Sequence, residues 1–388
     1  MPQYSTDIDT QIINLIKSFV DDKVLPIADK YDTEDIYPFE LVDEMANLGL
    51  FGITIPEQYG GLGFNHSTLA KIFEELSKGW MSLAGVIGTH HILAEIVSNF
   101  GNETQKKSFL PRMAKGDLRG GLALTESSSG TDVQNISTKA EKDGEEYVIN
   151  GSKMFISNGQ NGNAFAVLAR TKPKSEEPLH RGLSCFIVEK PAHGLTVAQK
   201  LDKLGYRGID TCELLFENVR VPAENLIGDI EGVGFKQVMS GLESGRINVA
   251  ARAVGVATAA FNSAIKYAQK RETFGKPIAD HQAIQFMLAD MATKIEAARL
   301  LTYEAAKKKD SGERVDLNAG MAKLFASEMC GEVAMDAMRI HGGYGYVKGL
   351  PIERFYREAP LMIIGEGTNE IQKLVIARRL LDNYNINL

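Results

Sequence analysis

The chain has few of the residues that build metal sites or disulfide frameworks. Its 388 residues include three cysteines, Cys185, Cys212 and Cys330, and no Cys-x-x-Cys pair. This spacing argues against a zinc site and favours free thiols in a reducing compartment. His90 and His91 are adjacent, but no Glu or Asp is spaced around them as an i, i+4 ligand set with an obvious third partner. We interpret both as packed or surface imidazoles and expect no bound metal.

Signals for nucleic acid or membrane are also missing. Lysine and arginine number 43 against 50 aspartates and glutamates, and the net charge of −7 argues against a nucleic-acid partner. The first residues lack a basic flank followed by an apolar core, and no later apolar run reaches the length of a bilayer span. We therefore expect no membrane partner and a cytoplasmic protein, or a mitochondrial matrix protein if a transit peptide has been removed.

The composition is that of a globular protein with several structural units. Hydrophobic residues make up 44% and charged residues 24%. A chain of this length exceeds one ordinary core, so two or three units are expected. Changes in periodicity place them at 1–118 (α-helical), 119–230 (β) and 231–388 (α-helical bundle). The predicted fold class is mainly α with a central β domain.

Local patterns support this division. In the first unit Ile12, Ile16 and Phe19 fall on one helix face, and Pro111 marks the end of its last helix or the start of a loop. In the second, the runs 146–149 and 153–156 flank Asn150-Gly151, which predicts a β-hairpin because both turn residues need positive φ. The loop 172–178 is expected to be exposed. In the third, apolar residues at heptad-like spacing over 284–295 predict a bundle.

Four segments have residues suited to chemistry, and each has a purely structural alternative. Residues 125–132 are small and hydroxylic and could cradle a flavin edge or phosphate, or form a simple turn. Residues 271–277 combine an arginine with a hydroxyl and an aromatic ring, which suits a diphosphate as well as an interhelical loop. Residues 341–346 could admit a cofactor or only end a helix.

The fourth segment, 363–370, places Glu366 between two glycines behind an apolar run. A carboxylate in apolar surroundings has a raised pKa and can act as a general base, although an acid at a helix entry is a respectable alternative. The sequence has no Walker motif and no Gly-x-Gly-x-x-Gly after a strand, so a nicotinamide-binding Rossmann unit is not expected.

Together the four segments resemble the acyl-CoA dehydrogenase family over essentially the whole chain. Residues 123–132 (Ala-Leu-Thr-Glu-x-x-Ser-Gly-Thr-Asp) resemble its first signature, 342–346 (Gly-Gly-Tyr-Gly-Tyr) its second, and 366–368 (Glu-Gly-Thr) the segment with its catalytic base. The resemblance implies an N-terminal helical domain, a middle β-barrel domain and a C-terminal four-helix bundle. It also implies bound FAD and a homotetramer, a dimer of dimers.

The resemblance also implies roles for individual residues. Glu366 would be the catalytic base. The flavin end of FAD would contact Leu124, Thr125, Thr131, Phe155 and Ser157. Its diphosphate and adenosine, across a subunit interface, would contact Arg271, Thr273, Phe274, His281, Gln282, Arg339, Gly342 and Gly343, with Thr368 and Glu370 beside the cofactor. The acyl-CoA substrate would contact Thr131, Glu243, Arg246 and Gly367.

By the same resemblance, Glu366 takes the pro-R α-proton of an acyl-CoA and a β-hydride passes to flavin N5, giving a trans-2-enoyl-CoA. The Glu366 backbone N–H and a flavin ribityl hydroxyl would stabilise the thioester oxygen. Electron-transfer flavoprotein would be the acceptor. The alternatives are an enoyl-CoA reductase, a dehydrogenase of carrier-protein thioesters, and a non-catalytic thioester-binding protein.

Several positions depart from the family pattern. A minority of the family carries its base at the position of Gly245, which leaves Glu366 as the candidate here. Phe155 and Ser157 stand where Trp and Thr are common, and Arg339 where Gln is common. Gly365 replaces a frequent Tyr, which suggests a wider pocket for branched, cyclic or otherwise bulky acyl groups.

Overall fold

The computed structural model describes residues 4–175 and 178–383. A helical layer comes first, and a π-helical turn at Val20–Val24 joins its first two helices. Its helices are α1 Tyr4–Phe19, α2 Leu25–Glu34, α3 Phe39–Asn47, α4 His66–Gly79, α5 Met81–Phe100 and α6 Glu103–Lys115. The side chain of Asn65 caps α4, and Asn102 and Gln105 form a capping box at α6.

Two expectations for this layer were wrong. Pro111 lies inside α6, which continues to Lys115 and ends at Gly116 with φ 79°. The sequence was also expected to lack any apolar run of bilayer length. By length and composition alone, however, α5 is long and apolar enough to cross a membrane. Since 83% of its most apolar window is buried inside the protein, α5 is the central helix of the core.

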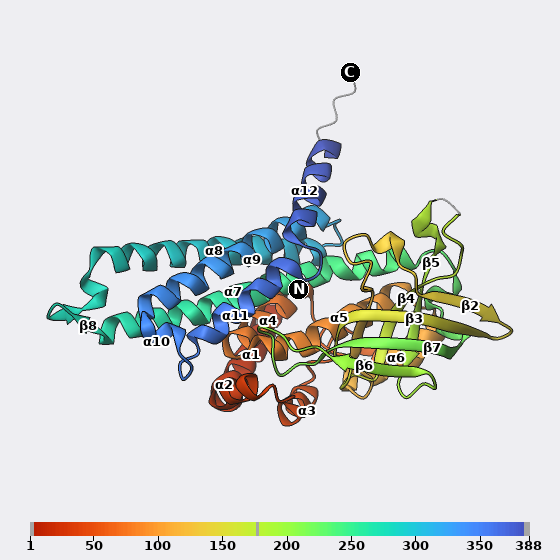
Figure 1. The fold of residues 1–388 in the computed structure, drawn as a ribbon, viewed down its shortest axis with the longest axis horizontal. Helices are drawn as coiled ribbons and strands as arrows, with labels where there is room; N and C mark the ends of the chain where they lie inside the picture. Colours follow the sequence, from red (N-terminus) through yellow and green to blue (C-terminus); the bar gives the residue numbers. More distant parts are fainter. Residues whose placement is uncertain (1–3, 176–177, 384–388) are drawn as a thin grey trace, which may run out of the picture.

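The middle of the chain forms one curled sheet, seen at the opposite end of the molecule from the β8 turn in Figure 1. The strand order is β1-β4-β2-β3-β7-β6, and β5 pairs with β4. Its strands are β1 Gly120–Ala123, β2 Lys139–Asp143, β3 Glu146–Ser157, β4 Ala164–Arg170, β5 Leu183–Glu189, β6 Leu195–Lys200 and β7 Thr211–Pro222.

The hairpin predicted at Asn150-Gly151 does not form. Both predicted runs belong to the single strand β3, and its register against β7 shifts at Gly151, where φ is 146°. A Cβ atom at position 151 would lie 2.7 Å from the Cα atom of Thr138, so the glycine admits a close strand approach. The real hairpin joins β2 to β3 through Gly144.

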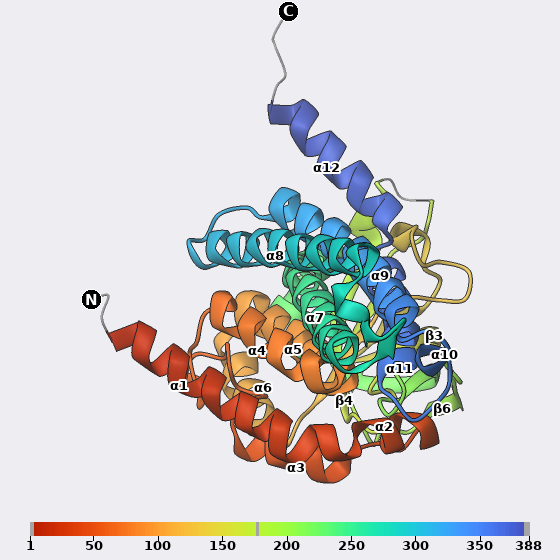
Figure 2. The ribbon, with the colours of Figure 1, turned by 90° about the vertical axis from the view of Figure 1, so that its left-hand side faces the viewer.

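The last part of the chain is a helical bundle. Figure 2 shows α7, α8, α9 and α11 grouped together, with α12 projecting away from them. Their bounds are α7 Gly234–Lys270, α8 Gln282–Asp310, α9 Asp316–His341, α10 Gly343–Tyr346, α11 Ile352–Ile364 and α12 Asn369–Asn383. The short strands β8 Glu272–Thr273 and β9 Lys276–Pro277 form the turn between α7 and α8.

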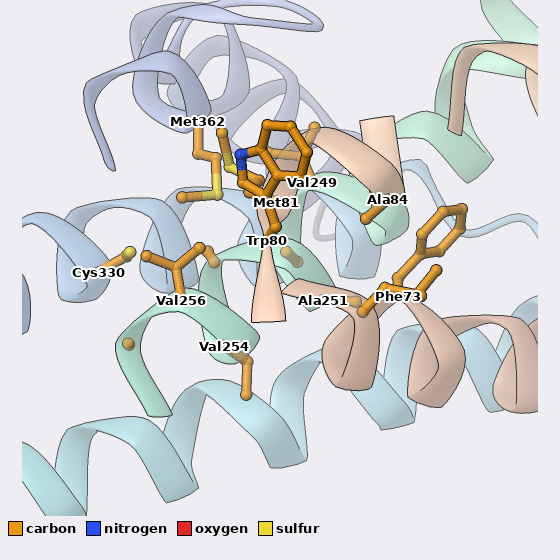
Figure 3. Close-up of a cluster of buried hydrophobic side chains, with 14 of the residues drawn as sticks. Phe73, Trp80, Met81, Ala84, Val249, Ala251, Val254, Val256, Cys330 and Met362 are labelled. Carbon is orange, nitrogen blue, oxygen red and sulfur yellow. The ribbon is translucent and has the colours of Figure 1, made fainter. Parts of the chain in front are cut away.

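The core joins the helical layer to the bundle. Figure 3 shows Trp80 at the start of α5, near Val249 of α7 and Met362 of α11, and all three side chains are buried. The mainly α architecture with a central β domain is thus confirmed, and the boundaries at 118 and 230 stay predictions.

Candidate active site

Glu366 lies in a tight turn between α11 and α12. Its φ is 54° and that of the following Gly367 is 86°. Positive φ costs a residue with a side chain of the order of 1 kcal/mol and persists where neighbouring contacts hold it. The turn therefore does more than reverse the direction of the chain, and neighbouring contacts hold the backbone of Glu366 in this conformation.

Lys323 of α9 holds this turn from within the protein. Its fully buried ammonium donates hydrogen bonds to the carbonyl oxygens of Ile363 (2.8 Å) and Gly367 (3.0 Å). A third bond, 2.8 Å long, goes to Oδ1 of Asn369 at the start of α12. Burial lowers the pKa of Lys323 to about 8. The three bonds bracket Glu366 and fix its backbone on both sides.

The Glu366 carboxylate is nearly enclosed. Oε1 accepts a hydrogen bond from Nη2 of Arg252 at 3.3 Å, and the buried Oε2 finds no hydrogen-bond partner among the described residues. Oε2 faces Gly245 of α7, where any Cβ atom would collide with it. Burial raises the pKa of Glu366, and Arg252, Lys323 and Arg246 partly offset this effect.

Arg252 connects Glu366 to the middle domain. Its guanidinium lies 5.8 Å from the ring centre of Tyr206, and Nη1 donates to the Tyr206 hydroxyl at 3.5 Å. The Tyr206 hydroxyl also interacts with Ser157, one of the predicted flavin contacts. The structure thus brings Ser157 and Glu366 to one place although they are far apart in the sequence.

The segment at the end of β1 is fixed by a buried ion pair. Lys153 donates to Oε1 of Glu126 at 2.9 Å and to the Leu124 carbonyl at 3.0 Å. Met154 N–H donates to the Thr125 carbonyl at 2.7 Å. Burial lowers the pKa of Lys153 to about 8. Glu126 therefore has a structural role, and it positions Leu124 and Thr125.

Two other predicted flavin contacts are exposed to solvent. Phe155 has φ 61° and a 64% exposed side chain, and Thr131 is also exposed. An aromatic ring held at positive φ and left uncovered is available to pack on a planar ligand.

A second group of predicted residues surrounds a cavity of about 580 Å³ at the far end of α7. Arg271, Thr273, Gly342 and Gly343 line it. A side chain at Gly342 or Gly343 would meet nothing within 4 Å, so the cavity is open there. An arginine beside open backbone suits a diphosphate, and these residues fit that part of FAD.

The remaining members of this group lie around the cavity without lining it. His281 hydrogen-bonds Thr273 at 3.0 Å. Phe274 is 97% exposed with φ 52°, and Gln282 is exposed. Arg339 points to Asp336 at 2.8 Å, so its guanidinium is engaged on its own helix.

The two groups lie too far apart to serve one FAD within one chain. From Arg252, which adjoins the Ser157 end, to Arg271 the chain runs along α7 for about 28 Å. The ribityl chain that joins a flavin ring to its diphosphate is much shorter. Figure 1 shows the sheet and the β8 turn at opposite ends of the molecule.

Of the predicted substrate contacts, Gly367 follows Glu366 in the turn, and Glu243 and Arg246 lie on α7, which faces Glu366 at Gly245. Thr368 and Glu370, predicted beside the cofactor, come next in the chain. Arg246 is buried and Glu243 half-buried on α7, and burial raises the pKa of Glu243 while Lys309 and Arg246 oppose the shift. Thr368 is partly buried, and Glu370 is exposed with a pKa lowered by its own backbone N–H and by Thr368. None of these positions tests the assigned roles, which stay predictions.

His90 and His91 are packed inside the core as expected. Their Nε2 atoms bond the carbonyl oxygens of Phe51 at 3.0 Å and Leu50 at 2.9 Å, and burial lowers their pKa to about 3 and about 4. Within residues 4–175 and 178–383, no group of three or more His, Cys, Asp or Glu side chains could hold a metal ion.

Sequence reasoning missed Arg252, Tyr206 and Lys323. Arg252 and Lys323 are single charges inside apolar, alanine-rich helices. A buried charged side chain is stable only with polar partners. A lone charge in an apolar helix was therefore a signal in the sequence that the helix faces a polar site. Tyr206 has no comparable signal.

This chain belongs to the acyl-CoA dehydrogenase family. The N-terminal, middle and C-terminal domains of acyl-CoA dehydrogenase match residues 6–117, 121–219 and 232–381. The family's FAD-dependent chemistry identifies the protein as a flavoenzyme with FAD as its cofactor, as the sequence predicted.

Two relatives illustrate the range of the family. The acyl-CoA dehydrogenase of Bacillus subtilis (strain 168) is 43% identical over 95% of this chain and 96% of its own length. An acryloyl-CoA reductase (NADH) of Anaerotignum propionicum is 42% identical over 95% of this chain and 93% of its own.

Solved structures agree with the fold. Butyryl-CoA dehydrogenase from Megasphaera elsdenii has a TM-score of 0.94 and 39% identity, and the match covers 98% of this chain and 100% of that one. A chain from structural work on the electron transferring flavoprotein of Acidaminococcus fermentans has a TM-score of 0.95 and 41% identity, with coverage of 98% and 100%.

Proposed function

We propose that this protein oxidises an acyl-CoA to the trans-2-enoyl-CoA with Glu366 as the base. The observation that carries the proposal is the Glu366 carboxylate, which is nearly enclosed, has a raised pKa and keeps one oxygen unpaired within the described part of the chain. An unpaired carboxylate oxygen can accept the α-proton of a thioester, and a raised pKa makes the carboxylate a stronger base.

The chain's own residues divide the remaining work. The backbone N–H of Glu366 donates to the thioester carbonyl, which stabilises the charge that develops as the α-proton leaves. Lys323 keeps that N–H and the carboxylate in a fixed relation. Leu124, Thr125 and Ser157 border the place of the flavin. Bound FAD would supply the hydride-accepting chemistry for the hydrogen on the β-carbon.

Glu366→Gln tests this assignment. The variant keeps the shape of the side chain but cannot take a proton, so turnover should fall by several orders of magnitude. FAD absorbance and acyl-CoA binding, seen as a perturbation of the flavin spectrum, should persist. Near-normal turnover in the variant would refute the role of Glu366.

The runner-up is the reverse reaction, reduction of an enoyl-CoA, which uses the same base and cofactor. It is favoured by the similarity to a relative that is an acryloyl-CoA reductase. Incubation with a reduced electron donor and an enoyl-CoA, compared with an acyl-CoA and an oxidised acceptor, separates the two directions.

Assembly and partners belong to the same proposal. The separation of the two FAD-binding groups along α7 supports a homo-oligomer in which one chain supplies Ser157 and a second supplies Arg271. A dimer of dimers satisfies this need. We further propose electron-transfer flavoprotein as acceptor and a cytoplasmic location, and the wider pocket beside Gly365 stays a prediction.

A further inference from the structure

The contact between α5 and α7 has one apolar end and one polar end. On α7, Gly241, Gly245, Asn248 and Arg252 follow one another at helical spacing and share a face. At the first of these, Gly241 packs against Ile92 and Ile96 of α5, where a Cβ atom would lie 3.1 Å and 3.0 Å from them. Glu366 faces the next position, Gly245.

Beyond Glu366 the contact becomes polar. Side chains at Gly85 and Gly88 of α5 would collide with the Tyr206 hydroxyl and the Asn248 amide, so both glycines make room for polar tips. Tyr206, Asn248 and Arg252 are 5%, 4% and 6% exposed. Three buried polar side chains together are costly unless something pairs with them.

This pairing is incomplete in the protein. Over residues 4–175 and 178–383, Nε of Arg252 and Oδ1 of Asn248 have no hydrogen-bond partner. Arg252 has one carboxylate contact there, the 3.3 Å bond to Glu366, which is longer than an ordinary charge-assisted bond. Each unpaired buried polar atom costs about 1–3 kcal/mol. In the free protein the Arg252 guanidinium therefore keeps hydrogen-bond donors that a ligand could use.

Charge around Glu366 is also unbalanced. Arg252, Arg246 and Lys323 all act on its carboxylate. Of these cations, Arg246 also faces Glu243 and Asp316, and Lys323 also faces Glu370 and Glu328. A further anion at the Arg252 end would be stabilised, whereas a hydrocarbon there would leave the guanidinium without compensation.

The orientation of the thioester follows from exposure. Residues 242–244 of α7 are partly exposed, whereas 245–257 are buried. A CoA moiety is large and charged and has to stay at the open end, so the acyl group extends past Glu366 towards Asn248 and Arg252. This step rests on the proposed function, because it assumes an acyl-CoA whose α-carbon lies at Glu366.

We propose that the acyl group ends in a carboxylate and that Arg252 binds this carboxylate, so that the substrate is a short dicarboxylic monothioester. A planar guanidinium matches a carboxylate through two parallel hydrogen bonds. The Tyr206 hydroxyl, 3.5 Å from Nη1 of Arg252, closes the same polar end. Binding would draw Arg252 from Glu366 and release the base only when a charged substrate is present.

The wild-type protein tests this without any mutation. Succinyl-, glutaryl- and adipyl-CoA are compared with butyryl-, valeryl- and hexanoyl-CoA and with the monomethyl ester of glutaryl-CoA, using an artificial electron acceptor. The best dicarboxylic substrate should exceed the uncharged acyl-CoAs and the methyl ester in kcat/KM by at least roughly a hundredfold. Preference for an uncharged acyl group or for the ester overturns the inference.

Arg252→Gln then isolates the residue. The preference for the dicarboxylic substrate should fall to within a few-fold, mainly through a higher KM, and Arg252→Lys should restore part of it. An equal loss on charged and uncharged substrates would overturn the inference, because Arg252 would then only position Glu366. FAD absorbance and Tm confirm that each variant folds. If a variant does not fold, the substrate panel on the wild-type protein alone tests the inference.

The two proposals fail in different ways. Oxidation of valeryl-CoA but not of glutaryl-CoA leaves Glu366 chemistry intact and sinks the carboxylate site. A flavin-loaded protein that oxidises none of these thioesters contradicts the proposed function itself, and the carboxylate site with it.

Discussion

At the scale of single residues, the site depends on what position 245 lacks. Glycine in the middle of a helix costs about 1 kcal/mol relative to alanine, and Gly245 lies inside the longest helix, α7. Its missing side chain is what lets Oε2 of Glu366 approach. Local helix stability is therefore lowered at the place where the carboxylate needs room.

Gly245→Ala should retain FAD but lose at least roughly tenfold in kcat, because the new methyl group pushes the carboxylate from its place. Gly331→Ala is the matched control, since its methyl group would lie 4.0 Å from Ile363 in ordinary contact. Steady-state rates and flavin absorbance are the measurements. Equal activity in both variants would show that Glu366 does not use this space.

Residue-level prediction named a candidate where a motif carried the information and named none where only packing did. Glu366 was found between two glycines in the sequence, and Arg271 beside a hydroxyl and an aromatic ring. Arg252 was not, because its meaning depends on Tyr206, a residue that the fold brings from another domain. The lone charge of Arg252 signals a polar site, but the sequence has no local pattern that identifies its partner.

At the scale of elements, the turn between α11 and α12 depends on α9. Lys323→Met removes three hydrogen bonds and a cation while keeping the length of the side chain. Since the cation lowers the pKa of Glu366, its loss should raise that pKa and shift the acidic limb of kcat/KM to higher pH.

Lys294→Met on the exposed side of α8 is the control, because Lys294 pairs only with Glu332 among the described carboxylates within 4 Å. The pH–rate profiles of both variants, measured with FAD content confirmed, decide the matter. A folded Lys323→Met protein with an unshifted acidic limb would contradict the electrostatic part of this role.

Element prediction failed at Asn150-Gly151 for a physical reason. An Asn-Gly pair predicts a turn because glycine readily adopts positive φ, but a glycine at an irregularity inside a strand can have positive φ as well. Gly151 has φ 146° within β3, where Thr138 comes close. The strand-like texture of residues 183–189 and 195–200 predicts strands there, and β5 and β6 have these bounds, because alternation or burial is carried by their own residues.

At the scale of the whole molecule, one arginine joins the three parts of the chain. Arg357 of α11 donates to Oδ2 of Asp32 at 2.5 Å and to the Leu204 carbonyl at 3.1 Å. Asp32 belongs to the first helical layer and Leu204 to the middle domain. Next to it, Glu358 is fully buried, and burial raises its pKa to about 7.

Glu358 makes the stability of the whole molecule depend on pH. Its folded-state pKa lies above the ordinary value of 4.5, so between these values the folded protein keeps a proton that the unfolded chain has released. Stability should fall as pH rises from about 4.5 to about 7, by roughly 3 kcal/mol, and then level off.

Glu358→Gln should flatten this slope. Urea unfolding of the FAD-loaded proteins at pH 5 and pH 8 measures it, with Glu145→Gln, at an exposed position, as the control. Parallel stability changes in wild type, variant and control would contradict the assignment of the slope to Glu358.

The burial of α5 has a consequence for synthesis. This helix packs on α7, which begins roughly 130 residues later in the chain. At about 5–20 residues per second, a ribosome would leave one apolar face of the nascent helix uncovered for roughly 7 to 27 seconds. Fragments that stop before residue 234 should therefore need a holding chaperone or form inclusion bodies.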